Sequence, residues 1–554
     1  MIKFWLTILC GFLAIFGAIA AWFASTTFTN DQQSRYPALK KLAGKKFTFG
    51  FIALIFGIIG YGINTWQTAV EALEPVVTTE GTIIKKATES GFDKEAQDAA
   101  DELKKRAKEY FGEGEKEFAA NNYMNAANNY KASIAFLPTM AAYLNEGISL
   151  HNISDYPDAL QAYEQGLLLA QRKGNRSFEA AFLGNIGLVY TNQGKLNDAL
   201  IYHQQALGIH KAIGEEQGQA SDFNNIGTVY SDQGKLEEAL NYYQQALSIH
   251  KAIGDEQGQA SDLTNIGSVY DNQGKLNDAL SYHQQALGIY RAIGNQLGEA
   301  AVSTNIGNVY FQQGKLNEAL NYHQQALGIH KAIGNQLGQA HNLTNIGNVY
   351  FQQGKLNDAL SYYQQALVIH KAIGNQQGYA SDLSNIGNVY SQQGKLNDAF
   401  NYFQQALGIQ QALGEQLGEA HDLTNIGNVY FQQGKLNDAL NYYQQALGIH
   451  KAIGNQLGEA ADLGNIGAVY SQQGKLNDAF NYFQQALGIQ KAIGEHIGEA
   501  NALCNIGLVY KDQGKLNDAL SYYQQALALY KIVGASIQVR IVEDNIKEVQ
   551  ARMK

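Results

Sequence analysis

The sequence repeats itself every 40 residues from about Ala180 to Ala535. The tripeptide Asn-Ile-Gly, first found at 185–187, occurs nine times in register and is last found at 505–507. A chain that repeats so short a unit does not build one central core. Each unit is too small to bury its own apolar face and must cover it with the next unit. The period therefore predicts a stacked array of similar units.

Each unit divides into two stretches with helical apolar spacing, such as Ala220–Asp232 and Glu237–Ile253. The break between them is Gln233-Gly234-Lys235, whose glycine suits the left-handed turn that ends a helix. Gly254 marks the end of the second stretch in the same way. No proline follows Pro157, so none interrupts these helices. The sequence predicts one pair of antiparallel helices per unit.

A glycine recurs in the middle of each first helix, where it costs about 1 kcal/mol relative to alanine. Its presence is explained if Gly227 and Ala239 let the two helices of a unit approach closely, with Tyr230 filling the space beside them. Leucine at position 227 is then expected to overpack this contact.

These positions resemble the tetratricopeptide repeat family. Ile226-Gly227-x-x-Tyr230, followed by Ala239, Tyr243 and Ala246, matches the family's small and large positions in order. The usual proline at the end of the repeat is replaced by Lys251, and the unit is longer by about six residues, as in the repeats of kinesin light chains and related adaptors. The resemblance implies an all-α superhelical solenoid of antiparallel helix pairs, with first helices that line a concave groove for protein ligands.

The array extends beyond the nine regular units of residues 180–535. Residues 107–179 fit two divergent units of about 34 residues each. Residues 536–554 carry Asn545-Ile546-Lys547 in register with Asn-Ile-Gly. A lysine in place of the glycine suits a terminal helix that no further hairpin covers. We therefore predict eleven hairpins followed by one C-terminal capping helix.

Two apolar runs precede the array. Residues 4–23 and 47–66 carry no charge, and each has the about twenty residues that a helix needs to cross a bilayer. The alternative for the first run is a cleaved signal peptide, but the run exceeds the usual apolar length of about 7–15 residues and a second run follows it. We predict that residues 1–66 form a two-helix membrane anchor in contact with lipid.

Basic residues indicate the orientation of this anchor. The loop between the two runs, residues 24–46, carries five of them, against Lys3 before it and Lys85 and Lys86 after it. The tendency of positive loops to remain in the cytoplasm predicts a multi-pass membrane protein whose repeats lie on the extracytoplasmic side. Residues 67–106 form a highly charged connector with one narrow apolar stripe. We expect a spacer helix that packs on the first repeat, with a short coiled-coil stalk as the alternative.

An asparagine recurs in the middle of each first helix, as at Asn345, although asparagine favours caps and turns over helix interiors. Two explanations remain open. The amide either fixes the angle between neighbouring hairpins, or forms one rung of a ladder that binds the backbone of an extended peptide through its donor and acceptor. Helices about 8–10 Å apart would place one rung at about every third residue of a chain that advances about 3.3 Å per residue. Related repeat proteins use asparagines in this way, so the resemblance favours the second explanation.

The middle of the array carries further candidates. Four units add a second amide one turn along the helix, and three add a phenylalanine that we expect to be exposed and to form anchoring pockets. Recent duplication without selection for binding is the alternative explanation. Alanine at Asn345, Asn348 and Asn385 is expected to leave thermal stability nearly unchanged while weakening ligand capture. The predicted peptide-binding residues are Asn225, Asn265, Asn305, Asn308, Phe311, His341, Asn345, Asn348, Phe351, Asn385, Asn388, His421, Asn425, Asn428, Phe431 and Asn465.

Other kinds of chemistry are not indicated. The formal net charge is −10 and the repeats hold no basic cluster, which argues against nucleic acid as a partner. Gln313-Gly314-Lys315 lacks the glycine spacing and the following Ser/Thr of a phosphate-binding loop. His323 and His330 are two helical turns apart, which is too far for one tetrahedral metal, so we assign such histidines to packing. Cys10 and Cys504 alone exclude a disulfide framework. We expect no catalytic residues, no metal and no cofactor.

The sequence thus predicts a membrane-anchored interaction scaffold, or adaptor, whose groove binds a segment of another protein. One alternative is a sensor whose solenoid changes curvature when a short peptide binds. Another is an envelope assembly factor, which differs from the adaptor only in its client.

Overall fold

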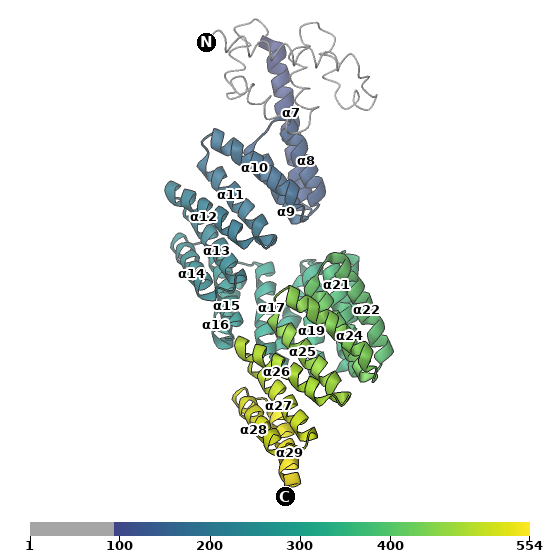
Figure 1. The fold of residues 1–554 in the computed structure, drawn as a ribbon. Coiled ribbons are helices and arrows are strands. Elements are labelled where there is room, and N and C mark those ends of the chain that lie inside the picture. Colours follow the sequence, from purple (N-terminus) through teal and green to yellow (C-terminus); the bar gives the residue numbers. More distant parts are fainter. Residues whose placement is uncertain (1–92, 554) are drawn as a thin grey trace, which may run out of the picture. The chain divides into compact units, whose positions relative to one another are not determined.

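The computed structural model describes residues 93–553, and their side chains from residue 101 onward. Every regular element in this range is an α-helix, and twenty-three helices follow one another as α7 to α29 (Figure 1). This confirms the all-α prediction. The chain divides after Gln233 into two units.

The first unit contains three hairpins and one further helix. Its helices are α7 (Asp93–Ala119), α8 (Tyr123–Phe136), α9 (Met140–Asn152), α10 (Tyr156–Arg172), α11 (Arg176–Asn192), α12 (Leu196–Ile213) and α13 (Glu216–Asp232). The hairpins pair α7 with α8, α9 with α10, and α11 with α12.

The second unit contains one helix, seven hairpins and a closing helix. Its helices are α14 (Leu236–Ile253), α15 (Glu256–Asn272), α16 (Leu276–Ala292), α17 (Gln296–Gln312), α18 (Leu316–Ala332), α19 (Gln336–Gln352), α20 (Leu356–Ala372), α21 (Gln376–Gln392), α22 (Leu396–Leu413), α23 (Gln416–Gln432), α24 (Leu436–Ala452), α25 (Gln456–Gln472), α26 (Leu476–Ile493), α27 (His496–Asp512), α28 (Leu516–Ile532) and α29 (Ser536–Met553). The hairpins run from α15 with α16 to α27 with α28.

Glycine and asparagine set the short turns between helices. Gly354 follows α19 with a φ of +72°, a conformation that residues with a Cβ rarely adopt. The next turn ends at Asn375, whose side chain accepts a hydrogen bond from the backbone N–H of Gly378 at 2.8 Å and so caps the start of α21. Gly234 and Gly254 have the same left-handed backbone, as the sequence predicts.

The recurring mid-helix glycine makes room for an aromatic or imidazole ring. A Cβ atom on Gly347 of α19 would lie 2.5 Å from the ring of Tyr363 on α20. The ring that packs on the glycine, Tyr363, therefore comes from the second helix of the hairpin. The sequence analysis had predicted a tyrosine of the first helix at this place, the one equivalent to Tyr350. Tyr350 instead stacks on Tyr362, with ring centroids 5.4 Å apart, and Lys355 Nζ lies 5.5 Å from its centroid. This stack holds the two helices together at the turn.

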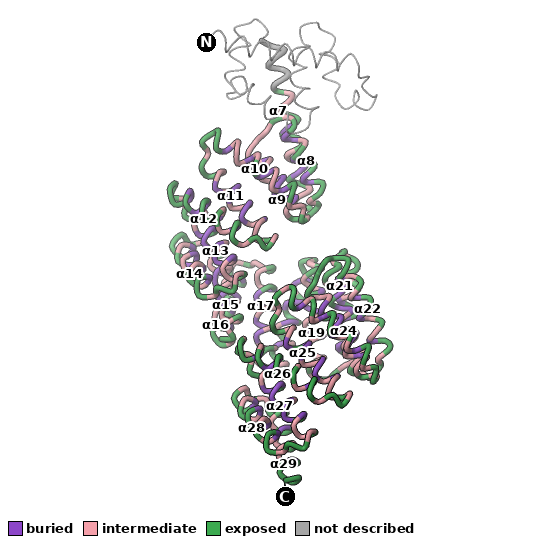
Figure 2. The backbone as a smooth tube through the Cα atoms, in the orientation of Figure 1, coloured by how far each residue is buried: buried purple, intermediate pink, exposed green. Residues whose placement is uncertain are grey.

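The core is divided among the joints between hairpins. Ala359 and Tyr363 of α20 form one buried cluster with Ile386 and Val389 of α21, and such clusters recur along the second unit. Figure 2 shows the result as buried stretches that alternate with exposed ones along each helix. Each hairpin thus buries apolar side chains against its neighbours, as the 40-residue period predicts.

The two ends of the described chain differ from the repeats. The helix α7 runs across the predicted boundary at residue 107, where Ala107 is buried and its carbonyl accepts a hydrogen bond from Ser133 Oγ at 2.8 Å. At the other end, Val542 and Val549 of α29 pack into the last cluster. Lys547, at the glycine position, points outward and pairs with Asp544 at 2.9 Å. The predicted domain limits themselves remain predictions.

Within residues 93–553, no helix combines the length and the apolar character that crossing a bilayer requires. The two predicted spans, residues 4–23 and 47–66, lie outside the described residues.

Candidate functional site

The recurring asparagines form a row of half-buried side chains on the first helices of the repeats. In the second unit, the amides of five of them make no hydrogen bond to another described residue, and these are Asn305, Asn345, Asn385, Asn425 and Asn465. Asn505 continues the row in the same state, and Asn225 of the first unit is also half-buried and unbonded. Asn265 has a contact of its own and does not count among the free amides.

The first copy of this asparagine, Asn185, makes hydrogen bonds within the protein. The amide of Asn185 donates to the carbonyl oxygen of Ala181 at 2.8 Å and accepts from the hydroxyl of Tyr163 at 3.5 Å. There the asparagine is used within the protein. From Asn305 to Asn505 the same position leaves its donor and acceptor available.

The second amides divide into two groups. Asn348 accepts a hydrogen bond from the hydroxyl of Tyr363 at 2.7 Å, and Asn428 accepts one from Tyr443 at 2.8 Å. In the units of Asn308 and Asn388 the tyrosine is replaced by His323 or Phe403, and neither amide has a hydrogen bond within the described chain. Asn348 and Asn428 therefore position a buried tyrosine, a role that the sequence interpretation missed. This role could have been predicted from the sequence, because each of these asparagines is followed by a tyrosine fifteen residues later.

The three predicted phenylalanines are not exposed. Phe311, Phe351 and Phe431 are each half-buried, and the last two pack against the buried clusters of the next joint. The expectation of exposed anchors was wrong because these residues lie at the end of the first helix, where the following hairpin covers them.

His341 and His421 lie on the exposed side of their helices, as expected. Their rings approach those of His370 and His450 on the second helix, with centroids 5.5 and 5.8 Å apart. Partial burial, and then the neighbouring imidazole, lower the pKa of both His341 and His421.

A set of three polar residues, a half-buried threonine with a buried histidine and aspartate, joins successive hairpins, and we call it the joint triad. Thr344 of α19 donates through Oγ1 to Oδ1 of Asp382 on α21 at 2.7 Å. His370 of α20 donates through Nδ1 to Oδ2 of the same carboxylate at 2.7 Å. Burial raises the pKa of Asp382, and the hydrogen bonds from His370 and Thr344 oppose the rise. Both helices of one hairpin thus bond the first helix of the next.

The joint triad recurs with variations. A complete copy consists of Thr424, His450 and Asp462, and a His–Asp pair at 2.6 Å is also formed by His210 with Asp222 and by His250 with Asp262. The sequence analysis assigned such histidines to packing and missed this pairing, although histidine and aspartate recur twelve residues apart.

A second set of histidines is packed without a carboxylate partner. His203, His283 and His323 are almost fully buried, and burial lowers the pKa of each to about 4, so the rings are neutral at pH 7. The ring of His203 occupies the space above Gly187. In the described part of the chain, no group of histidine, cysteine and acidic residues is arranged to hold a metal ion.

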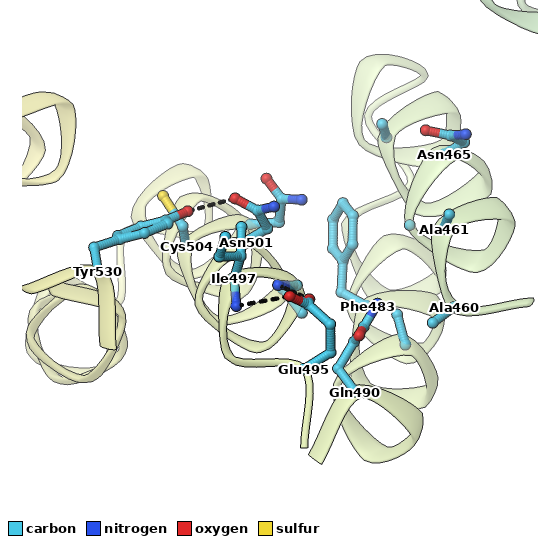
Figure 3. A pocket seen from close by; sticks show the side chains of 16 residues that line it. Ala460, Ala461, Asn465, Phe483, Gln490, Glu495, Ile497, Asn501, Cys504 and Tyr530 are labelled. Atoms are coloured by element: carbon cyan, nitrogen blue, oxygen red, sulfur yellow. Dashed lines mark hydrogen bonds between the residues drawn. The ribbon is translucent and has the colours of Figure 1, made fainter. Parts of the chain in front are cut away.

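The joint between α25, α26 and α27 has none of the three triad residues and contains a cavity of about 490 Å³ (Figure 3). Between α25, α26 and α27, the threonine, histidine and aspartate positions hold Gly464, Gln490 and Ala502. All three residues line the cavity, and Asn465 and Asn505 of the asparagine row line it as well.

Comparison with protein-family models matches one described as tetratricopeptide repeat. The matched segments together cover more than half of the chain, and they are residues 138–212, 218–292, 298–372, 336–412, 379–452 and 458–532. The comparison with curated proteins found no match.

Several solved structures have a similar arrangement of helices. Aspartyl phosphate phosphatase F from Bacillus subtilis aligns at 14% identity with a TM-score of 0.46, over 64% of this chain and 93% of that one. A Rap protein complexed with competence and sporulation factor aligns at 16% identity and 0.44, over 63% and 99%. BtubC from P. vanneervenii aligns at 17% identity and 0.37, over 40% and 92%. At these scores the likeness carries no argument about function.

Proposed function

The chain belongs to the tetratricopeptide repeat family, and we propose that it is a scaffold or adaptor that binds an extended segment of another protein along its asparagine row. The observation that carries this proposal is the row of half-buried amides without internal partners, from Asn305 to Asn505 at every fortieth residue. A half-buried amide that lacks a partner gains more from a ligand than a fully hydrated one, because part of its hydration is already lost.

The chemistry of the row suits a peptide backbone. Each free amide offers one acceptor oxygen and a donor NH₂ group, which complement a peptide unit whatever its side chain. The residues one turn before and after Asn465 are Ala461 and Ala468, and those around Asn425 are His421 and Asn428. No aspartate, glutamate, lysine or arginine occupies these positions, so the row does not depend on such charges to select its ligand.

The proposal includes attachment to a membrane. The uncharged runs of residues 4–23 and 47–66 support an anchor, and the basic loop between them supports an extracytoplasmic position for the repeats. Protease treatment of intact cells tests the orientation. Cleavage within residues 107–554 before lysis is expected, and protection until lysis would contradict it.

The proposed binding is tested with the full-length chain in native membranes. The variant N345A/N385A/N425A removes three free amides, and crosslinking with mass spectrometry compares what it captures with what the unaltered chain captures. The matched control is N321A/N401A/N441A, which removes three exposed asparagines from the second helices. A partner lost only from the first variant supports the proposal. Equal recovery of every crosslinked protein from both variants contradicts it.

A further inference from the structure

The cavity between α25, α26 and α27 lies where Gly464, Gln490 and Ala502 replace the joint triad. At the preceding joint, Thr424, His450 and Asp462 occupy the space between the helices and bond one another. At this joint Gly464 has no side chain, and Ala502 has no carboxylate. A volume of about 490 Å³ is left, which lies in the range of about 300–1,000 Å³ that is typical of ligand sites.

The cavity contains one buried polar atom without a partner. Gln490 of α26 stands where other repeats have the triad histidine, and it is only 6% exposed. Its Oε1 atom is buried and accepts no hydrogen bond. An unpaired buried acceptor is costly, so a ligand that donates a hydrogen bond to Gln490 gains affinity there.

The rest of the lining is polar and apolar in about equal parts and carries no positive charge. Figure 3 shows the ring of Phe483 and the small side chains of Ala460 and Ala461 facing Ile497 across the cavity. Glu495 is the one charged residue of the lining, and its oxygens already accept the backbone N–H groups of Ile497 and Gly498 at the start of α27. An anionic side chain is therefore disfavoured, and an apolar one is favoured.

Two members of the asparagine row line this cavity. Asn465 and Asn505, one on each of the two first helices, both line it and both have free amides. Asn501 is not available in the same way, because its Oδ1 accepts a hydrogen bond from the hydroxyl of Tyr530 at 2.5 Å. A segment held by the two free amides directs one side chain toward Gln490.

We propose that this cavity binds a single aromatic side chain that carries a hydrogen-bond donor, tryptophan or tyrosine, from the segment bound along the row. This rests on the proposed function for the source of the side chain. An aromatic ring buries about 150–250 Å² and fills an apolar cavity, while its indole N–H or phenol O–H reaches an acceptor. The apolar part of the lining, formed by Phe483, Ile497 and several alanines, and the unpartnered oxygen of Gln490 together match that chemistry.

The test uses two small probes, indole and 1-methylindole, with the purified full-length chain and equilibrium dialysis. We expect indole to bind at one saturable site, with 1-methylindole about five- to tenfold weaker because it has no donor. Gln490→Leu keeps the shape but removes the acceptor, so it is expected to abolish the difference between the probes. Absence of saturable indole binding to the unaltered chain would overturn the inference, as would an unchanged preference in the Gln490→Leu variant.

A second variant closes the cavity with the chain's own joint triad. Gly464→Thr, Gln490→His and Ala502→Asp together reproduce the neighbouring joint, so the fold is expected to be retained in a thermal melt. Indole binding is expected to be lost, and indole binding equal to that of the unaltered chain would overturn the inference.

Failure of the inference and failure of the proposed function are distinguishable. The variant N345A/N385A/N425A lies outside the cavity and is expected to bind indole normally while losing its crosslinked partner. Normal indole binding without any asparagine-dependent partner would remove the proposed function and leave the cavity as a site for an aromatic donor. An asparagine-dependent partner without indole binding would remove only the inference.

Discussion

His370 and Asp382 bond each other across the joint between α20 and α21, with Nδ1 and Oδ2 2.7 Å apart and both side chains almost fully buried. Because Thr344 bonds the other oxygen, each helix of one hairpin bonds the same carboxylate of the next. Apolar contacts alone tolerate small shifts, whereas these bonds require one spacing of helices. The triad therefore contributes to the regular angle between repeats that keeps the asparagines in one row.

Asp382→Ala is expected to lower the free energy of unfolding by about 3 kcal/mol. The substitution leaves the buried His370 without its acceptor, and removal of one partner from a buried pair is strongly destabilising. Asp358→Ala, which alters an exposed aspartate in the first turn of α20, is the control and is expected to change stability by less than about 0.5 kcal/mol. Urea unfolding measures both. Equal effects would contradict the assigned role of the triad.

Asp422 is expected to make the joint between α22 and α23 sensitive to pH. Gln410 replaces the triad histidine there, Ser384 bonds Oδ1 at 2.6 Å, and Oδ2 has no partner. Burial raises the pKa of Asp422 from 3.8 to about 7. The folded state therefore binds a proton more tightly than the unfolded state does. The stabilisation that this bound proton gives is complete below about pH 4, and it is lost as the pH rises through about 7.

Two substitutions test this dependence. Asp422→Asn removes the ionisation and is expected to raise stability at pH 8 by on the order of 1–3 kcal/mol, with little effect at pH 4. Gln410→His supplies the missing partner and is also expected to stabilise the chain at neutral pH. Melting temperatures at a series of pH values measure both effects. A stability curve of the same shape for Asp422→Asn and the unaltered chain would contradict the expected titration.

Gly347→Leu is expected to destabilise the hairpin of α19 and α20 by about 1–3 kcal/mol, because any side chain there overlaps the ring of Tyr363. The matched control is Gly328→Ala in α18, where a new Cβ atom meets no atom within 4 Å. That change is expected to stabilise the chain by up to about 1 kcal/mol, since alanine forms helices better than glycine. Circular dichroism melts measure the stability of both variants. A change of stability in the same direction for both would be incompatible with the packing described for Gly347.

The fold could be predicted closely because its information is local and repeated. The glycines at 234 and 254 mark turns by their own backbone preference, and a 40-residue period permits little besides stacked hairpins. The partners of polar side chains could not be predicted in the same way. Whether His370 meets Asp382 depends on how two hairpins are rotated against each other, and that rotation is set by packing. The half-burial of Phe351 depends on the same rotation.

Asn345 and Asn348 lie one turn apart on α19 and are expected to respond differently to alanine. The sequence predicts that both changes leave stability nearly unchanged. In the structure, however, Asn348 accepts a hydrogen bond from the hydroxyl of Tyr363, a residue that is only 2% exposed. Asn348→Ala leaves that buried hydroxyl without its acceptor and is expected to cost about 1–2 kcal/mol. Asn345 has no such bond, and alanine there is expected to change stability by less than about 0.5 kcal/mol.

A double-mutant cycle separates the two roles. When Tyr363 is replaced by phenylalanine, Asn348→Ala is expected to lose most of its effect on stability, because no hydroxyl remains to be satisfied. Asn345→Ala is expected to reduce capture of the bound segment with either residue at position 363. Unfolding experiments and crosslinking of the same five variants (Asn348→Ala, Tyr363→Phe, Asn345→Ala and the two combinations with Tyr363→Phe) give the two readouts. A large loss of stability for Asn345→Ala would assign that amide to the joint between hairpins and would argue against its place in a binding row.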